Sequence, residues 1–150
     1  MNIFVIDTNI LVFAGRTDDR RSGSALDLIL IISQKHTIAL DSYFGEIFHE
    51  YSRNLNDSGV VFKLIVKMMT RGERVVFGRT VLPSATLRKL QMPPGFDKDD
   101  LKFAEVAFAT VASIITEDTE PGDFDGRVSQ ILQEDLNIKV HTINTALQFV

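Results

Sequence analysis

The stretch NIFVIDTN, residues 2–9, decides the fold of this 150-residue chain. Residues 2–6 form a continuous run of strand length in which apolar and polar residues do not alternate. A strand with this pattern is buried on both faces, as strands of parallel sheets are. We therefore expect a central strand at residues 2–6 that ends at the carboxylate of Asp7.

Helical and strand patterns alternate along the rest of the chain. They predict helices at residues 8–14, 25–33, 44–55, 60–70, 100–112 and 126–136, and strands at 36–40, near 75–77 or Val81, 113–116 and 138–143. Segment 78–96 is hard to assign apart from a turn at Pro93-Pro94-Gly95, and it is a candidate for shaping the entrance to a site. The alternation predicts right-handed βαβ crossovers and a three-layer α/β/α sandwich, with a central, mainly parallel sheet of four to five strands.

The length and the hydrophobic content of 45% predict one domain spanning residues 1–150. The chain has no cysteine, which excludes disulfides and thiolate metal sites. No stretch reaches the roughly 18 apolar residues of a membrane span, so we expect no membrane contact and a cytoplasmic location. The formal charge of −4 excludes nucleic-acid binding by a bulk positive field alone.

Acidic residues stand where predicted strands or turns lead into helices. Asp7 ends the first strand, Asp97, Asp99 and Asp100 precede a helix, and Asp118 follows a strand. Each has an ordinary structural explanation, since aspartates cap helices, favour helix N-termini and form turns. In a doubly wound fold, however, the carboxyl ends of the strands meet, which would gather these acids into one cluster.

Such a cluster would suit Mg²⁺ or Mn²⁺, which prefer oxygen ligands and keep several waters in an open site. A bound ion can lower the pKa of a water molecule and offset charge that develops on a phosphodiester. Without the ion, the carboxylates would repel one another, and some of their pKa values should rise.

Four phrases that span nearly the whole chain carry a family resemblance. They are VIDTNILV (5–12), EYSRNL (50–55), DKDDLKFAEVAFA (97–109) and IITED (114–118). In this order they resemble the PIN-domain family of metal-dependent nucleases. The resemblance implies a central parallel sheet, an acidic pocket for Mg²⁺ or Mn²⁺, and hydrolysis of phosphodiester bonds, most often in RNA.

Residues of the first two phrases match the first two acids of the family pattern. Asp7 matches the first acid, and Thr8 and Asn9 match the polar pair that follows it. Glu50 fits the second acid better than Glu46, which lies one helical turn earlier. The resemblance thus implies that Asp7 and Glu50 are catalytic metal ligands, with Thr8 and Asn9 supporting them.

The last two phrases match the third and fourth acids. Asp100 matches the third by its spacing in the motif, with Asp99 as the close alternative, and Asp118 matches the fourth, in the Thr-x-Asp phrase that begins at Thr116. Thr116 would orient a ligand. The sequence departs from the family pattern after Asp118, because four residues intervene before Asp123. The fourth acid is therefore displaced, or Asp123 contributes to the site.

Basic residues are candidates for substrate contacts. Arg16, Arg20 and Arg21 lie in the loop after the first predicted helix. Their ordinary role is solvation of the surface. Their functional role would be to hold the phosphate backbone beside an acidic pocket that otherwise repels it.

The leading hypothesis is an Mg²⁺- or Mn²⁺-dependent endoribonuclease that uses Asp7, Glu50, Asp100 and Asp118. The resemblance further suggests the toxin of a toxin–antitoxin pair, with RNA as substrate, an antitoxin as partner and a homodimer as assembly. The alternative is a PIN-like module that binds RNA or protein without cutting. A response-regulator receiver would need a second acid near the first strand, and a haloacid-dehalogenase-like phosphatase would need an aspartate where Asn9 stands.

Overall fold

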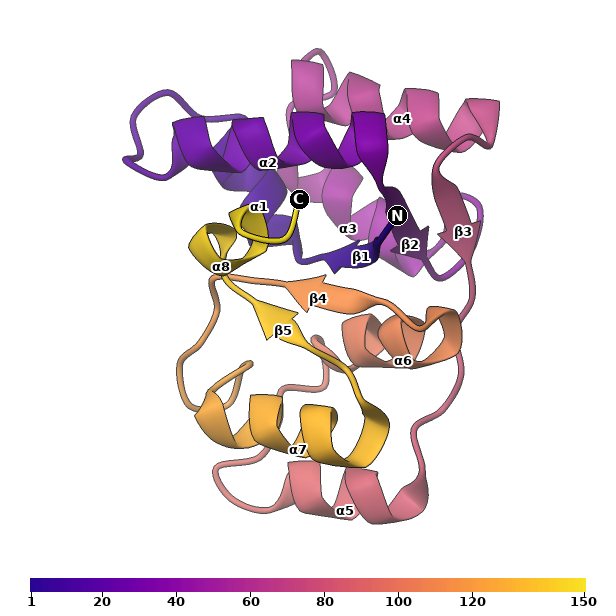
Figure 1. The fold of residues 1–150 in the computed structure, drawn as a ribbon, viewed down its shortest axis with the longest axis vertical. Coiled ribbons are helices and arrows are strands. Elements are labelled where there is room, and N and C mark those ends of the chain that lie inside the picture. The colour runs from indigo at the N-terminus through magenta and orange to yellow at the C-terminus, as the bar shows by residue number, and fades with distance from the viewer.

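The computed structural model describes residues 1–150 and contains a five-stranded parallel sheet (Figure 1). The strand order is β3-β2-β1-β4-β5, and every neighbouring pair is parallel. The strands are β1 (Ile3–Ile6), β2 (Thr37–Leu40), β3 (Val75–Phe77), β4 (Ser113–Ile115) and β5 (Val140–His141). The expected α/β architecture with a central sheet is confirmed.

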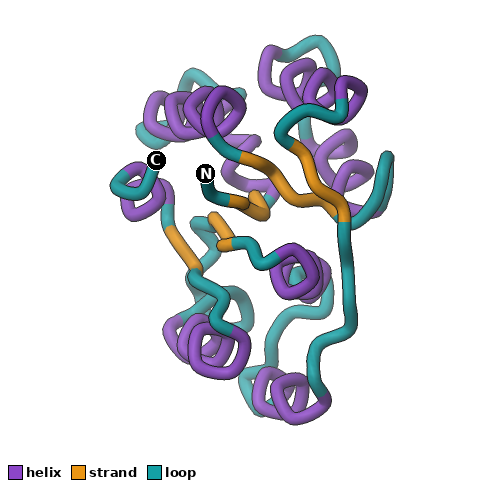
Figure 2. Tube along the Cα trace, turned by 45° about the vertical axis from the view of Figure 1, so that its right-hand side comes forward, coloured by secondary structure: helices purple, strands orange, loops and turns teal.

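Helices cover both faces of the sheet, so that the strands lie between two helical layers (Figure 2). One side carries α1 (Thr8–Ala14), α2 (Ser22–Lys35), α3 (Glu46–Asn54), α4 (Val60–Arg71) and the short α8 (Ile143–Leu147). The other side carries α5 (Ser84–Gln91), α6 (Leu101–Thr110) and α7 (Gly126–Leu136). None of the helices has the length and apolar character required to cross a membrane.

The central position of β1 follows from its composition. Phe4, Val5 and Ile6 are all buried, as expected for an apolar strand with helices on both faces. The strand pairs with β2 on one side and with β4 on the other. The buried hydrophobic side chains of both layers form one continuous cluster around it.

The chain reverses its winding direction between β1 and β4. The connection from β1 leads through α1 and α2 to β2, whereas β4 leads through α7 to β5 on the other side of the sheet. Connections that diverge in this way leave a crevice at the carboxyl ends of the two strands. Asp7 and Thr116 directly follow these strands and therefore lie at that crevice.

One segment without an expected element proves to be helical, and one expected strand end was wrong. Segment 78–96, left unassigned by its pattern, contains the helix α5, which packs against α7. The last strand, expected to reach Ile143, ends at His141, because Thr142 starts the helix α8. The Thr142 side chain accepts a hydrogen bond from the backbone N–H of Thr145, and the Thr145 side chain accepts one from the Thr142 N–H. This reciprocal capping ends the extended chain.

Candidate functional site

Asp7 directly follows β1 at the carboxyl end of the sheet and is only 4% exposed. Its backbone N–H donates to the carbonyl of Ile115 at 2.9 Å, which joins it to the end of β4. The Thr116 hydroxyl donates to Asp7 Oδ2 at 2.7 Å and accepts from the backbone N–H of Asp118 at 3.0 Å. Asp7 occupies the N-cap position of α1 but makes no side-chain capping bond. Its carboxylate therefore faces the crevice instead of serving the helix.

Glu50 reaches the same crevice from α3. The neighbouring Tyr51 is fully buried, and its hydroxyl donates to the carbonyl of Ile6 at 2.5 Å, immediately before Asp7. This bond ties α3 to the end of β1. The Thr8 hydroxyl donates to Glu50 Oε2, so Glu50 is attached to the residue that follows Asp7. Glu50 lies close enough to Asp7 for its charge to contribute to the raised pKa of the Asp7 carboxyl.

The direction of α3 is set by the turn that follows β2. The Asp41 carboxylate accepts from the backbone N–H groups of Glu46 and Ile47 at 2.8 and 3.2 Å, and so caps the helix from outside. A Cβ atom at Gly45 would lie 2.2 Å from Ser42 Oγ and 2.7 Å from the Asp41 carboxylate. The turn therefore requires glycine at this position if the cap is to form.

Asp100 approaches the crevice at the start of α6. One oxygen each of Asp97, Asp100 and Asp123 lie within 4.8 Å of one another. Asp100 occupies the N-cap position of α6, but its side chain makes no capping bond, so the ordinary capping explanation does not apply to it. These three carboxylates therefore lie close together, and Asp97 Oδ1 also accepts from the backbone N–H of Asp99 at 2.9 Å.

Segment 119–122, which departs from the family pattern, folds into a closed loop. The backbone N–H of Phe124 donates to the carbonyl of Asp118 at 3.0 Å, so that the two ends of the loop meet. The N–H of Asp97 donates to the Gly122 carbonyl at 2.7 Å and holds the loop beside the start of α6. The insertion therefore leaves both Asp118 and Asp123 at the crevice.

Segment 78–96 ends beside this loop. The buried Phe96 packs edge-on against Phe124 with ring centroids 5.1 Å apart. After β3 the chain runs across to the opposite helical layer before it enters α5 (Figures 1 and 2). The segment thus supports the side of the site that carries Asp97 and Asp123.

The buried aspartates of the crevice have raised pKa values. Burial raises the pKa of Asp7 to about 6, and the charges of Asp118 and Glu50 add to the rise while the Thr116 bond opposes it. Burial also raises the pKa of Asp100 to about 8, helped by Asp7, Asp123 and Asp97. Burial and Asp123 raise the pKa of Asp118 as well. A divalent cation would reverse these shifts.

The side-chain amide of Asn9 is a further polar group of the crevice that lacks a satisfactory hydrogen-bond partner. It approaches Asp118 closely enough to offset part of the rise in the pKa of that carboxyl. Both polar atoms of its side chain are nevertheless buried without a hydrogen bond of normal geometry. Such atoms are uncommon in folded proteins and call for a partner such as water or a ligand.

Lys102 is the residue of this site that the sequence analysis missed, and only 5% of its side chain is exposed. Its ammonium group donates to Glu50 Oε1 at 2.8 Å and to the backbone carbonyl of Asp99. A lysine within the mostly apolar run LKFAEVA was the available signal. Lysine is almost never fully buried unless it is paired.

The remaining candidates are distributed around the crevice or away from it. Glu46 is exposed and pairs with Arg79 at 2.6 Å, and Arg79 also binds Glu105 at 2.9 Å. Asp99 is exposed and contributes its backbone carbonyl rather than its carboxylate. The structure therefore places neither Glu46 nor the Asp99 carboxylate among the facing acids.

The three arginines lie in different surroundings. Arg21 stacks on Phe13, with its guanidinium carbon 3.7 Å from the ring centroid, and pairs with Asp19 at 3.1 Å. Asp118 is among the charges that raise the Arg21 pKa, after the bond to Asp19. Arg20 is exposed to solvent. Of the three, Arg21 is the one held rigidly near an acid of the crevice.

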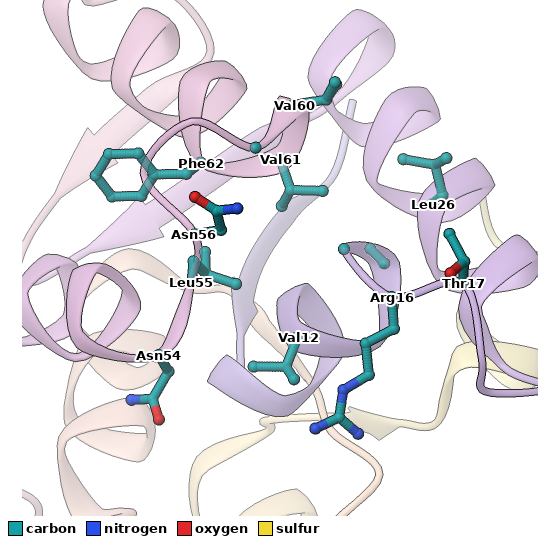
Figure 3. Close-up of a pocket in the computed structure, with 13 residues that line it drawn as sticks. Val12, Arg16, Thr17, Leu26, Asn54, Leu55, Asn56, Val60, Val61 and Phe62 are labelled. Atoms are coloured by element: carbon teal, nitrogen blue, oxygen red, sulfur yellow. The ribbon is translucent and has the colours of Figure 1, made fainter.

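Arg16 lines a separate surface cavity of about 480 Å³ (Figure 3). The cavity lies between α1, α2 and the turn that joins α3 to α4, and its wall includes Val12, Leu26, Val61 and Phe62. None of the acidic residues described above lines it. The cavity and the acidic crevice are therefore distinct features of the surface.

Comparisons with known proteins identify no family. Neither protein-family models nor curated proteins match the sequence. Among solved structures, a chain from the crystal structure of VapBC2 from Rickettsia felis bound to a DNA fragment from their promoter is similar, with 18% identity and a TM-score of 0.47. The similarity covers 93% of this chain and 98% of that chain. A likeness of this extent supports no conclusion about family or function.

Proposed function

We propose that this protein is a PIN-domain nuclease that hydrolyses phosphodiester bonds of RNA internally, with Mg²⁺ or Mn²⁺ as cofactor. The observation that carries the proposal is the group of aspartates that form no salt bridge near the carboxyl ends of β1 and β4, where the pKa values of Asp7 and Asp100 rise to about 6 and about 8. The sequence phrases that resemble the family supply Asp7, Asp100 and Asp118, and Asp123 follows the last of these phrases.

The donor set fits a hard divalent cation. Ligand oxygens on an octahedral Mg²⁺ at about 2.1 Å lie roughly 3 to 4.2 Å apart. The oxygens of Asp97, Asp100 and Asp123 already lie within 4.8 Å of one another, so small side-chain movements would bring them onto one ion. Asp7 and Asp118 would complete the oxygen ligands from the other side of the crevice, and the unpartnered Asn9 amide could bind a coordinated water.

When bound, the ion would supply a water of lowered pKa and offset charge on the phosphodiester. The chain's own residues would hold this arrangement in place. Thr116 fixes the rotamer of Asp7 and the backbone of Asp118 through one hydroxyl. Asp100 and Asp123, whose charges repel each other in the absence of metal, would accept the ion and lose that repulsion.

Arg21 is the residue that we propose for binding the phosphate backbone. Asp19 and the Phe13 ring immobilise its guanidinium group, which remains partly exposed. A cation held in this way loses little conformational entropy when a phosphate binds. In a chain with a net charge of −4, a local cation at the edge of the crevice is needed to bring an anionic substrate to the acids.

A single PIN-like domain of this kind would act as the toxin of a toxin–antitoxin pair. In that role a small antitoxin would be its protein partner, and the toxin would form a homodimer. This part of the proposal rests on the sequence resemblance alone. Size measurement of the purified chain, alone and together with the product of a neighbouring short reading frame, would test it.

The decisive experiment is cleavage of a circular RNA by the purified protein with Mn²⁺, Mg²⁺ or EDTA. A circle has no ends, so its cleavage requires an endonuclease. The Asp7→Asn variant should be folded and inactive, whereas Asp57→Asn, which alters an exposed acid of the α3–α4 turn, should cut normally. If wild-type protein that is folded and free of inhibitor cuts nothing with either metal, the chain is instead a non-catalytic binding module.

A further inference from the structure

Lys102 divides the acids of the crevice into two groups. Its ammonium group lies 2.8 Å from Glu50 Oε1, and it also donates to the backbone carbonyl of Asp99. The second oxygen of Glu50 accepts from the Thr8 hydroxyl. Both oxygens of Glu50 therefore have a donor already. Asp7, Asp100 and Asp123, by contrast, have no ion pair with any basic residue.

Burial makes this pairing more than an incidental surface contact. The Lys102 side chain is 5% exposed and the Glu50 side chain 21% exposed. A buried lysine requires fixed hydrogen-bond acceptors, because its ammonium group loses its hydration shell. A metal ion that bound Glu50 would have to approach or displace this ammonium group, and the two cations would repel each other.

We propose that Lys102 is the built-in counter-ion of the crevice: it neutralises Glu50 and holds it as a positioning residue, while the aspartates alone bind the divalent ion. This inference rests on the proposed metal-dependent function. It also reassigns the second acid of the family pattern, since Glu50 would orient Thr8 and α3 in place of coordinating metal. Lys102 itself is then a positioning residue that sets the net charge of the site.

The test is a double-mutant cycle on Mn²⁺ affinity, measured by electron paramagnetic resonance of free Mn²⁺ without RNA. The variants are Lys102→Met, Glu50→Gln and the double variant that carries both substitutions. Lys102→Met leaves Glu50 uncompensated, so Mn²⁺ should bind about tenfold more tightly. Glu50→Gln leaves the ammonium group uncompensated, so Mn²⁺ should bind about tenfold more weakly. The double variant should return to within about threefold of wild type, because both charges are removed together.

A matched control separates this local effect from the overall charge of the chain. Lys98 is an exposed lysine four residues before Lys102. At physiological salt, Lys98→Met should change the Mn²⁺ affinity less than about twofold, because screening weakens exposed charges. Equal tightening by Lys98→Met and Lys102→Met would overturn the proposal, because a general charge effect would then explain both.

Other results would also overturn it. If Glu50 coordinates the ion, the double variant should bind Mn²⁺ at least tenfold more weakly than wild type. If Lys102 only supports the fold, Lys102→Met should leave the affinity unchanged. Should Lys102→Met fail to fold, the comparison of Glu50→Gln with the double variant carries the test, since replacing both members of a buried pair is often neutral for stability. Restored affinity in the double variant supports the proposal, and unrestored affinity refutes it.

Failure of this inference can be told apart from failure of the proposed function. Wild-type protein that binds no Mn²⁺ at millimolar concentration would refute both. Protein that binds Mn²⁺ and cuts circular RNA, but whose double variant loses the metal, would refute only the role given to Lys102.

Discussion

Replacing Asp7 by asparagine should stabilise the metal-free protein while abolishing its activity. Burial raises the pKa of this carboxyl from 3.8 to about 6, so the folded state holds the proton more tightly than the unfolded chain does. The free energy of unfolding therefore falls as the pH rises from about 4 to above 6. A shift of about two units corresponds to roughly 3 kcal/mol lost above that range. Asparagine has the same shape and carries no charge to desolvate, and its side-chain oxygen can accept the Thr116 bond.

The gain should depend on pH. In EDTA at pH 8, where Asp7 is ionised, Asp7→Asn should raise the melting temperature by roughly 5 to 10 °C for a domain of this size. At pH 5 the folded Asp7 carboxyl is mostly protonated while the unfolded one is mostly ionised, so about half of the gain should remain, and the melting temperatures should differ by roughly half as much as at pH 8. Thermal unfolding followed by circular dichroism at the two pH values measures both effects. Asp57→Asn, at an exposed acid, serves as the control.

Added Mn²⁺ should reverse the order at pH 8. The wild-type protein should gain stability by binding the ion in its folded state, whereas Asp7→Asn should gain much less. Two results would refute the reasoning: a variant that melts below wild type at pH 8 in EDTA, or a difference in melting temperature that is the same at pH 5 and pH 8. Either would mean that the buried charge of Asp7 is compensated within the chain.

Three further substitutions test single features of the structure. Thr116→Val removes the hydroxyl that binds Asp7 and should weaken Mn²⁺ binding about tenfold or more in a titration, with Thr116→Ser restoring it. Val111→Gly should raise the free energy of unfolding by about 1 kcal/mol in urea, because Val111 is 86% exposed and has a φ of 57°, which glycine adopts without strain. Gly45→Ala should lower the free energy of unfolding by about 1–3 kcal/mol, because the new Cβ atom would displace the Asp41 carboxylate that caps α3. An unchanged urea midpoint would contradict this.

The sequence was sufficient to predict the sheet because its central strand has an unambiguous pattern. An apolar run without alternation, followed by Asp7, predicts a strand buried on both faces, and Phe4 to Ile6 are buried in that way. The end of β5 could not be read in the same manner. Thr142 and Thr145 cap α8 through their hydroxyls, and this pair lacks the glutamate or glutamine that makes such a box recognisable.

The role of Lys102 could not be predicted, because sequence spacing does not report which side of a buried helix faces an acid. Residues 102–107 of α6 are all buried, so the helix shows no polar face from which orientation could be inferred. Only the three-dimensional placement of α3, fixed by the bond from Tyr51 to Ile6, brings Glu50 to the ammonium group. A contact between residues 52 positions apart is a tertiary property.

The structural and functional explanations of the aspartates predict different surroundings for the carboxylate. A carboxylate that caps a helix accepts backbone N–H groups of the first helical turn. Asp125 has the capping bond, since it accepts from the backbone N–H of Val128 at 2.8 Å. Asp7 and Asp100 occupy N-cap positions without such bonds, and their pKa values rise. A cation site requires acids whose ionisation lowers the stability of the metal-free protein. A bound cation can then recover that free energy.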